Sequence, residues 1–380
     1  MRRKYKAIIK SISKYFKQKS ILITFSIPLI FLSEICLSYS KIPKSIEAIY
    51  SEMINNHKNN QIITGQNIKI ITYNLGLLNL PLLRITEPEF VQRSNKLFEF
   101  FSLYLNNEKP HIVFLQELWH EDDFKTILKV AKLHNYTPAL NKAPAIEKEA
   151  AHGLQILIKS NLIEKNDPKT NFKKFESQGF REWLTSIQRG YLIVEFTGLG
   201  NKVIKIFNTH LSPYPTFNPN ASEKDILKSN RVQQAVELGK EVNKAIKNLD
   251  FVVTAGDFNS GAEIGGLTSD HNEREWFSDF HPYEKFINYS NKYNSMSNCL
   301  IDTFRVANPK SPGHTQVQEN PIAKRSPNSG GEPDQRLDYI FIGGNSKFKV
   351  LESRLIFVTK PMSDHYAIQS KIRIEQRKRK

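Results

Sequence analysis

Residues 250–259 read DFVVTAGDFN, an apolar and β-branched run that stops at an acidic residue and an asparagine. Such a run predicts a buried strand, and it places Asp257 and Asn259 where that strand ends. Similar apolar runs recur at 67–74, 111–117, 153–159, 190–196, 202–210, 336–343 and 365–374. We therefore expect a sheet-based domain in which several strand ends carry polar side chains.

Amphipathic segments separate these expected strands. Apolar residues recur at helical spacing over 97–105, 124–131 and 232–249. Ser222, with Asp225 three residues later, is typical of a cap before the third of these helices. The stretch 308–336 is rich in Pro, Gly, Ser and Asn, which predicts a long surface loop. The alternation of strands and helices indicates one mixed α/β domain.

The composition is that of a globular protein, with 39% hydrophobic residues in a chain of 380. The net charge of +16 is concentrated at the ends: residues 1–19 hold +8 and residues 371–380 hold +5, which leaves +3 for residues 20–370. A nearly balanced body argues against a surface that binds duplex nucleic acid, although a local basic patch stays open. Two cysteines, Cys36 and Cys299, exclude a disulfide framework and a cysteine-based zinc site.

The first 40 residues have the pattern of an export signal. A basic stretch precedes the short apolar run 21–32, and Ser38 and Ser40 follow at a plausible cleavage point. The alternatives are an uncleaved anchor, which would need about 20 apolar residues whereas Glu34 ends this run, and a cytosolic amphipathic start. We expect a secreted or periplasmic protein, membrane-anchored if the leader is retained. A polar linker is expected at 41–66, a folded domain at 67–374 and a basic tail at 375–380.

Eight polar residues lie at the ends of the expected strands and are candidates for one shared site. Taken singly, each is typical of a turn or a solvated loop. Packed sheets bring strand ends together, so residues far apart in sequence can line one cleft. The candidates are Asn74, Glu117, His210, Asp257, Asn259, Asp338, Asp364 and His365.

The residue types in this set suit hydrolysis of a phosphodiester. Glu117, Asp364 and Asn74 offer hard oxygen ligands for Mg²⁺, Mn²⁺ or Ca²⁺. His365 offers a base that Asp338 could orient. His210 and Asn259 are donors for an anionic transition state. A metal, a base and charge-stabilising donors are what the attack of water on a phosphodiester requires.

Six motifs along the chain resemble the endonuclease/exonuclease/phosphatase superfamily, in its order and rough spacing. They are ITYN, FLQELW, NTHL, AGDFN, RLDYIFI and SDHYAI, and the resemblance covers 67–374. Within the superfamily the chain is most similar to the neutral sphingomyelinases, through Leu118–Trp119, NTHLSPYP, NRVQQAVELGKEV and Arg189–Gly190. The resemblance implies the DNase I-like fold, a four-layer α/β/β/α sandwich of two packed mixed sheets, with 67–374 as the catalytic domain.

The resemblance also implies a role for each candidate. Glu117 would be the principal Mg²⁺ ligand, with Asn74 beside the metal and Asp364 supporting that side. His365 would be the general base and Asp338 its orienting partner, while His210 and Asn259 would contact the phosphate. Asp257 would align the nucleophile or a phosphate neighbour, and whether it or His365 takes the proton stays open. No acid that pairs with His210 is evident from the sequence.

Substrate contacts are expected from Arg189 and Trp183. Phe172, Phe175, Phe180 and Trp183, interleaved with basic residues, could form a surface that inserts at a lipid interface. The alternative is that these aromatic residues belong to the core. The segment LGLLNLP after Asn74 departs from the aromatic-containing segment common in sphingomyelinases, so contacts made there stay open.

The expected function is Mg²⁺-dependent hydrolysis of a membrane phospholipid, sphingomyelin in the first place, to ceramide and phosphocholine. We expect a monomer that makes peripheral contact with the membrane. One alternative is a secreted DNase I-like endonuclease, and another is a phosphatase for inositol phosphates. The alternative from outside enzymology is a catalytically inactive surface protein that binds lipid or a partner, but all eight site positions carry a suitable residue.

Overall fold

The computed structural model describes residues 65–80, 85–87, 89–145, 151–179, 182, 185, 187–213, 229–261, 273–292, 299–326 and 334–375. The predicted leader, residues 41–64 of the predicted linker, the cap at Ser222, Trp183 and residues 376–380 of the basic tail lie outside these ranges. Gly65 and Gln66, the last residues of the predicted linker, begin the first strand. No helix in the described ranges is both long and apolar enough to cross a membrane.

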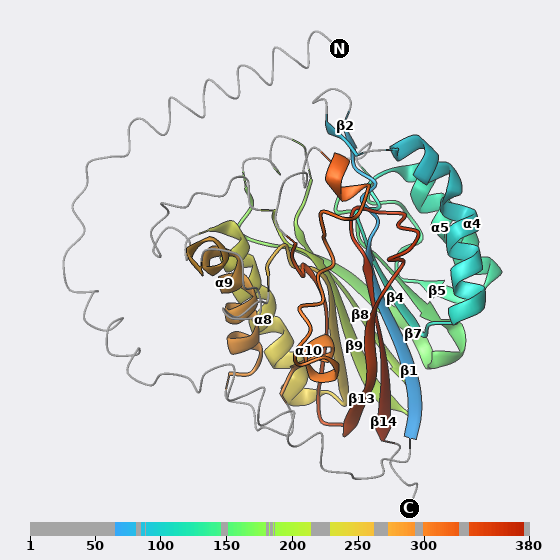
Figure 1. Cartoon of the computed structure of the whole chain (residues 1–380). Helices are drawn as coiled ribbons and strands as arrows, with labels where there is room; N and C mark the ends of the chain where they lie inside the picture. The colour runs from blue at the N-terminus through green and yellow to red at the C-terminus, as the bar shows by residue number, and fades with distance from the viewer. Residues whose placement is uncertain are drawn as a thin grey trace, which may run out of the picture. The chain divides into compact units, whose positions relative to one another are not determined.

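Two six-stranded sheets form the centre of the domain (Figure 1). The first has the order β13-β14-β1-β4-β6-β5, with β13 Phe348–Ile356, β14 Ala367–Glu375, β1 Gly65–Asn74, β4 Ile112–Gln116, β6 Gln155–Lys159 and β5 Tyr136–Pro138. The second has the order β11-β12-β10-β9-β8-β7, with β11 Ile301–Asp302, β12 Asp338–Gly343, β10 Phe251–Asp257, β9 Lys202–His210, β8 Gly190–Gly198 and β7 Ile163–Lys174. A short pair, β2 Asn79–Leu80 and β3 Ile85–Thr86, lies apart.

Both sheets are mixed, because β1 pairs with β4 and β9 with β10 in parallel while the other pairs are antiparallel. The sheets pack face to face, with β1 against β10 and β12. Along β1 the side chains alternate between the two faces. Ile71 and Tyr73 belong to the core beneath the outer helices, and Thr72 takes part in a polar network that reaches the other sheet.

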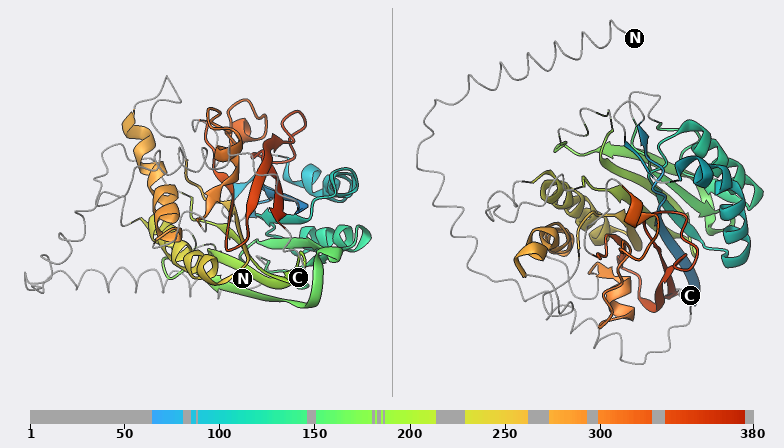
Figure 2. Two further views of the ribbon diagram at one scale, coloured as in Figure 1. Left: turned by 90° about the horizontal axis from the view of Figure 1, so that it is seen from below. Right: turned by 45° about the horizontal axis from the view of Figure 1, so that its top comes forward.

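Helices cover the outer face of each sheet. Helices α4 (Phe90–Glu108) and α5 (Glu121–Leu133) pack on the first sheet, where Leu97, Phe101 and Phe124 join its core. Helices α8 (Asn230–Asn248) and α9 (Glu273–Ser290) cover the second sheet, and both views of Figure 2 show the same order of layers. The short α10 (Thr303–Ala307) follows β11. The predicted four-layer α/β/β/α sandwich is confirmed.

The described residues of 308–336 form a loop, as predicted, but part of this loop is buried rather than on the surface. Thr315, Asn320 and Ala323 have an exposed fraction of 0%, and a 3-10 turn spans Ala323–Arg325. The polar composition suggested solvent exposure throughout. In the folded chain these polar groups instead satisfy backbone hydrogen bonds of two strand ends, which a sequence pattern does not reveal.

Candidate active site

The register of the second sheet aligns three of the predicted site residues in one row. Asp257, the last residue of β10, is in register with His210 of β9 on one side and with Asp338 of β12 on the other. On the first sheet Asn74, at the end of β1, is in register with Gln116 of β4, and Glu117 follows directly. Because the sheets pack face to face, the two sets of strand ends meet at one edge of the sandwich.

Local backbone geometry explains why these strands end as they do. Glu117 and Asn259 both adopt the left-handed region, with φ of 57° and 46°. Residues held in this sparsely populated region are common at functional sites. Gly256 has a φ of 139°, and a Cβ there would lie 2.0 Å from the Thr209 carbonyl oxygen. The AGD sequence therefore needs glycine so that β9 and β10 can place His210 and Asp257 side by side.

A buried amide pair fixes the two sheets to each other beneath the site. The side chain of Gln116 donates to Oδ1 of Asn208 at 2.7 Å, and Asn208 donates to the carbonyl oxygens of Leu115 and Gln155 at 2.8 and 2.9 Å. Both amides are fully buried. Gln116 directly precedes Glu117, and Asn208 lies two residues before His210. The pair therefore ties the ends of β4 and β9 together.

Asn74, Glu117, His210 and Asp257 form one connected cluster. The Asn74 amide donates to Oδ2 of Asp257 at 2.9 Å and to Oε1 of Glu117 at 3.3 Å. His210 Nε2 lies 3.3 Å from Oδ2 of Asp257 and 3.9 Å from Oε1 of Glu117. Of these two acids Asp257 lies nearer to His210, whose acidic neighbour could not be identified from the sequence.

His365 and Asp338 form a second pair at the same edge. Nδ1 of His365 and Oδ2 of Asp338 are 2.7 Å apart, and both side chains are buried. Ser363 shapes the turn before β14, because its hydroxyl accepts from the His365 amide at 3.2 Å and donates to Oδ1 of Asp364 at 3.0 Å. The hydrogen bond to Asp338 leaves Nε2 of His365 available for a substrate-side proton.

Burial and charge shift the pKa values across the site. Burial, followed by the charge of Asp364, raises the pKa of Glu117 to about 7, and burial raises that of Asp257 to about 6. Burial and the charge of Arg189 hold the pKa of His210 well below its usual value, so its ring is neutral. Burial alone would lower the pKa of His365, but the charge and hydrogen bond of Asp338 raise it well above the usual range.

Comparison of the sequence with models of known protein families identifies one family over most of the folded domain. The model of the endonuclease/exonuclease/phosphatase family matches residues 71–365. The chain belongs to this family. The match begins within β1 and ends at His365, so it spans every strand-end residue of the site.

Individual members of the family resemble the chain at low sequence identity. Mouse sphingomyelin phosphodiesterase 2 is 22% identical over 319 residues, which are 81% of this chain and 66% of that protein, slightly under two thirds of its length. Truncated Caenorhabditis elegans TDP2 has a TM-score of 0.52 at 17% identity and covers 81% of this chain and 98% of its own. D. rerio TDP2, solved with a single-strand DNA product, has a TM-score of 0.51 at 16% identity, covering 81% and 99%. These structures share the fold.

The site also has the composition of a metal centre of this family. Asp257, Asp338 and His365 are a buried group whose ligand atoms lie within 4.8 Å of one another. Oδ1 of Asp338 is buried and has no hydrogen-bond partner in the described part of the chain. The pKa values of Glu117 and Asp257 are raised mainly by burial and, to a smaller extent, by neighbouring carboxylates, Asp364 beside Glu117 and Asp338 beside Asp257. A divalent cation would offset this cluster of buried negative charge. The residues present therefore fit a divalent cation.

The ligand group found by distance differs from the predicted set of Glu117, Asn74 and Asp364. Within that group, Asp338 and His365 are already hydrogen-bonded to each other, which accounts for their closeness without a cation. Asp364 lies on the side of Asn74, since a Cβ on Gly76 would come within 2.3 Å of its Oδ1. Glu117 is hydrogen-bonded to Asn74. The oxygens of Glu117, Asn74 and Asp364 all lie outside the hydrogen-bonded pair of His365 and Asp338.

The three residues predicted to contact phosphate or substrate, Asn259, Arg189 and Trp183, differ in their surroundings. The Asn259 amide donates to the Leu211 carbonyl oxygen at 2.9 Å, so this side chain braces the loop after His210. Arg189 is buried: its guanidinium lies 5.6 Å from the ring centroid of Trp119, and its Nε lies 3.6 Å from Oε1 of Glu182. Trp183 lies outside the described residues.

Sequence reasoning missed the aromatic wall of the site. Trp119 is 1% exposed, and its ring centroid lies 6.2 Å from that of His210. Its place in the motif FLQELW was the available signal.

Phe175 is 1% exposed and Phe172 stacks on His152 with ring centroids 4.0 Å apart. Phe175 therefore follows the core alternative. Phe172 is half-buried and does not decide between the alternatives, and Phe180 lies outside the described residues, as does Trp183.

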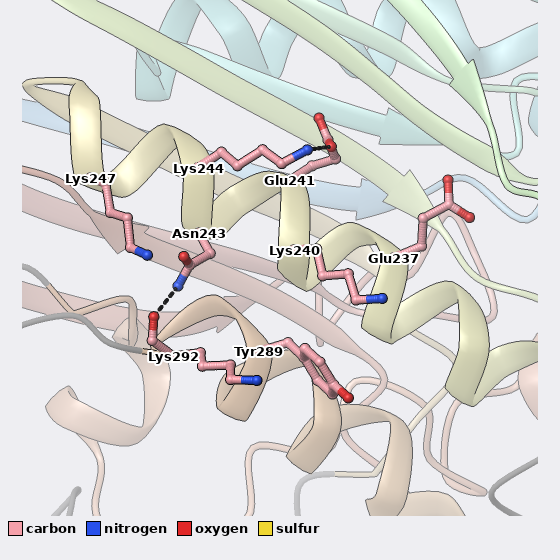
Figure 3. A pocket seen from close by; sticks show the side chains of 8 residues that line it. All are labelled: Glu237, Lys240, Glu241, Asn243, Lys244, Lys247, Tyr289 and Lys292. Atoms are coloured by element: carbon pink, nitrogen blue, oxygen red, sulfur yellow. Dashed lines mark hydrogen bonds and ion pairs between the residues drawn. The ribbon is translucent and has the colours of Figure 1, made fainter. Parts of the chain in front are cut away.

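A separate cavity of about 370 Å³ lies between α8 and the end of α9 (Figure 3). It contains none of the strand-end residues. Its lining is mostly charged, with an ion pair between Lys244 and Glu241 at 2.7 Å. The lining residues are Glu237, Lys240, Glu241, Asn243, Lys244, Lys247, Tyr289 and Lys292. The chemistry of the protein is therefore assigned to the strand ends and not to this cavity.

Proposed function

We propose that this family member is a Mg²⁺-dependent phosphodiesterase that hydrolyses sphingomyelin or a related choline phospholipid to a lipid alcohol and a phosphorylated head group. The observation that carries the choice of substrate is the similarity to mouse sphingomyelin phosphodiesterase 2 over 81% of the chain. Export by the basic and apolar leader belongs to the same proposal, because it would bring the enzyme to lipid on an exposed membrane leaflet.

Glu117 is the proposed principal ligand of the cation, with Asn74 and Asp364 beside it. When bound, a divalent cation polarises a phosphoryl oxygen and offsets negative charge as it develops. The chain itself supplies the arrangement of acids. The Asn74 amide bonds to both Glu117 and Asp257, so it holds the two carboxylates at a fixed separation.

His365 is the proposed general base. Oδ2 of Asp338 accepts a hydrogen bond from Nδ1–H of His365 at 2.7 Å, which leaves Nε2 as the basic nitrogen. The oxygen of water forms a bond to phosphorus while its proton passes to Nε2 of His365. The bond between phosphorus and the ceramide oxygen breaks, and that oxygen takes up a proton from solvent. The products are ceramide and phosphocholine.

His210 and Arg189 are proposed to stabilise charge on the phosphate. Nε2 of the neutral His210 ring lies 3.3 Å from Oδ2 of Asp257, so the ring faces the acid cluster, where a phosphate oxygen would bind. Arg189 is 7% exposed, and its Nη1 has no hydrogen-bond partner among the residues that the structure describes. A buried guanidinium with an unused donor beside the acids suits a phosphate oxygen.

Nucleic acid is the second candidate substrate. The D. rerio TDP2 structure, which shares this fold, holds a single-strand DNA product. Against this candidate, the net charge of residues 20–370 is only +3, whereas binding to several phosphates calls for a basic face.

A paired assay tests the proposal. The full-length chain in detergent is incubated with sphingomyelin mixed micelles and, separately, with supercoiled plasmid in the same Mg²⁺ buffer. We expect phosphocholine release that EDTA and His365→Ala both abolish. Plasmid cleavage without phosphocholine release, lost in His365→Ala, would overturn the lipid substrate and leave the site assignment in place.

A further inference from the structure

The two members of the His365–Asp338 pair belong to different sheets. Asp338 begins β12 in the second sheet, and His365 precedes β14 in the first. Their separation of 2.7 Å therefore depends on how the two strand ends are held against each other. One stretch of the chain, residues 315–320, contacts both ends, and we refer to it as the strap.

Thr315 contacts both strand ends through its own atoms. Its hydroxyl accepts from the backbone amides of Leu337 at 3.0 Å and Asp338 at 3.3 Å. Its carbonyl oxygen accepts from the amide of Tyr366 at 2.6 Å, and its amide donates to the Gln335 carbonyl oxygen at 2.8 Å. Thr315 is fully buried. Four hydrogen bonds from one residue thus link the backbone beside Asp338 to the backbone beside His365.

Two further residues of the strap contact these strand ends. Gln316 forms isolated β-bridges with Gln335 and with His365. The buried Asn320 amide donates to the Ser363 carbonyl oxygen at 2.9 Å, two residues before His365. The strap therefore holds the turn that carries His365, but Thr315 is the residue whose side chain bonds to the backbone of Asp338 itself.

We infer that Thr315 is a positioning residue, whose hydroxyl fixes Asp338 in hydrogen-bonding reach of His365. The inference rests on the proposed role of His365 and Asp338 but is independent of the substrate. Without the hydroxyl, two buried amides at the start of β12 lose their acceptor, and the strand end moves to find another. A displacement of about 1 Å at a catalytic group is enough to cost about 100-fold in rate.

Thr315→Val tests the hydroxyl, because valine keeps the shape and removes the acceptor. We expect kcat to fall about 30-fold or more with KM changed by less than about threefold, since the pair acts on the chemical step. Thr315→Ser, which restores the hydroxyl, should recover most of the loss. Thr315→Cys, a weak acceptor, replaces the valine variant if that variant does not fold.

Thr303→Val is the matched control. Thr303 is equally buried, and its hydroxyl bonds to the carbonyl oxygen of Ile340 on β12 and to the hydroxyl of Ser370 on β14, both at 2.8 Å. It bridges the same two strands farther from the pair. We expect Thr303→Val to lower the melting temperature by an amount comparable to Thr315→Val, with kcat within about twofold of the parent.

A double-mutant cycle with Asp338→Asn separates positioning from general damage. If Thr315 acts through Asp338, Thr315→Val should lower kcat far less in the Asp338→Asn background than in the parent. Three outcomes would each overturn the inference. In the first, the double mutant loses kcat by the product of the two single losses. In the second, Thr315→Ser recovers nothing, and in the third, Thr303→Val loses as much kcat as Thr315→Val. Asp338→Asn alone reports on the pair: an unchanged kcat there would overturn the proposed dyad instead.

Discussion

Nδ1 of His365 and Oδ2 of Asp338 lie 2.7 Å apart, although the two residues precede or begin strands of different sheets. Both side chains are buried, with exposed fractions of 6% and 0%. A charge-assisted contact of this length fixes the tautomer of the ring, so that the basic nitrogen is Nε2. The chemistry of the site therefore depends on the packing of one sheet on the other.

The first prediction concerns the pH dependence of activity. His365 must be neutral to accept a proton, and Asp338 raises its pKa well above the usual value, so activity should rise with pH through that raised pKa. Asp338→Asn removes the charge that stabilises the imidazolium. We expect the acidic limb of kcat/KM to move down by about one pH unit or more, and the plateau of kcat to fall by about 100-fold. An acidic limb that stays in place would contradict the assignment of His365 as the base.

The second prediction concerns metal binding. Burial and the charge of Asp364 raise the pKa of Glu117 to about 7, so this carboxyl carries a proton in much of the metal-free protein at pH 6. A cation binds the carboxylate and displaces that proton. Calorimetry in buffers of different ionisation enthalpy should detect close to one proton released per Mg²⁺ at pH 6 and little at pH 8. Affinity should fall roughly tenfold per pH unit below pH 7. Glu117→Gln should remove the proton release, and equal release at both pH values would argue against Glu117 as the ligand.

The third prediction concerns Gly256. Its φ of 139° is unfavourable for any side chain, and a Cβ would lie 2.0 Å from the Thr209 carbonyl oxygen. Gly256→Ala should lower the free energy of unfolding by about 3 kcal/mol or more, from backbone strain and overpacking together. Gly261→Ala is the control, because no atom of the described ranges lies within 4 Å of its added Cβ. Chemical denaturation of both variants measures the difference, and similar stability of the two would contradict the described contact.

The fourth prediction concerns the buried ion pair of Arg336 and Asp302. Their side chains are both 0% exposed and meet at 2.8 and 3.1 Å in a forked contact. Arg336→Met would leave the Asp302 carboxylate buried without its cation, and we expect a loss of about 3–5 kcal/mol in the free energy of unfolding. Arg354→Met removes a half-exposed pair with Glu108 and should cost less than about 1 kcal/mol. Urea unfolding measures both losses in the free energy of unfolding, and equal losses in the two variants would contradict the prediction.

Much of the fold and the site could be predicted because the strands carry strong local patterns. The run before Asp257 and the run before Glu117 are short, apolar and bounded by polar residues, and both are strands that end where the pattern ends. Contacts between strand ends leave no such pattern. Three such contacts join residues that are distant in sequence: Asp257 with His210, Thr315 with Asp338, and Arg189 with Trp119.

The sequence by itself determined the family, the strands that carry the site and the residue types of the site, because apolar periodicity and strand-end motifs are local properties of the chain. Tertiary structure decided which residues are partners. Only the packing of two sheets brings Asp338 to His365, and only the strand register puts Asp257 between His210 and Asp338. The physical reason is that hydrogen bonds and pKa shifts depend on distances of a few ångströms in a buried environment, which are set by the whole fold.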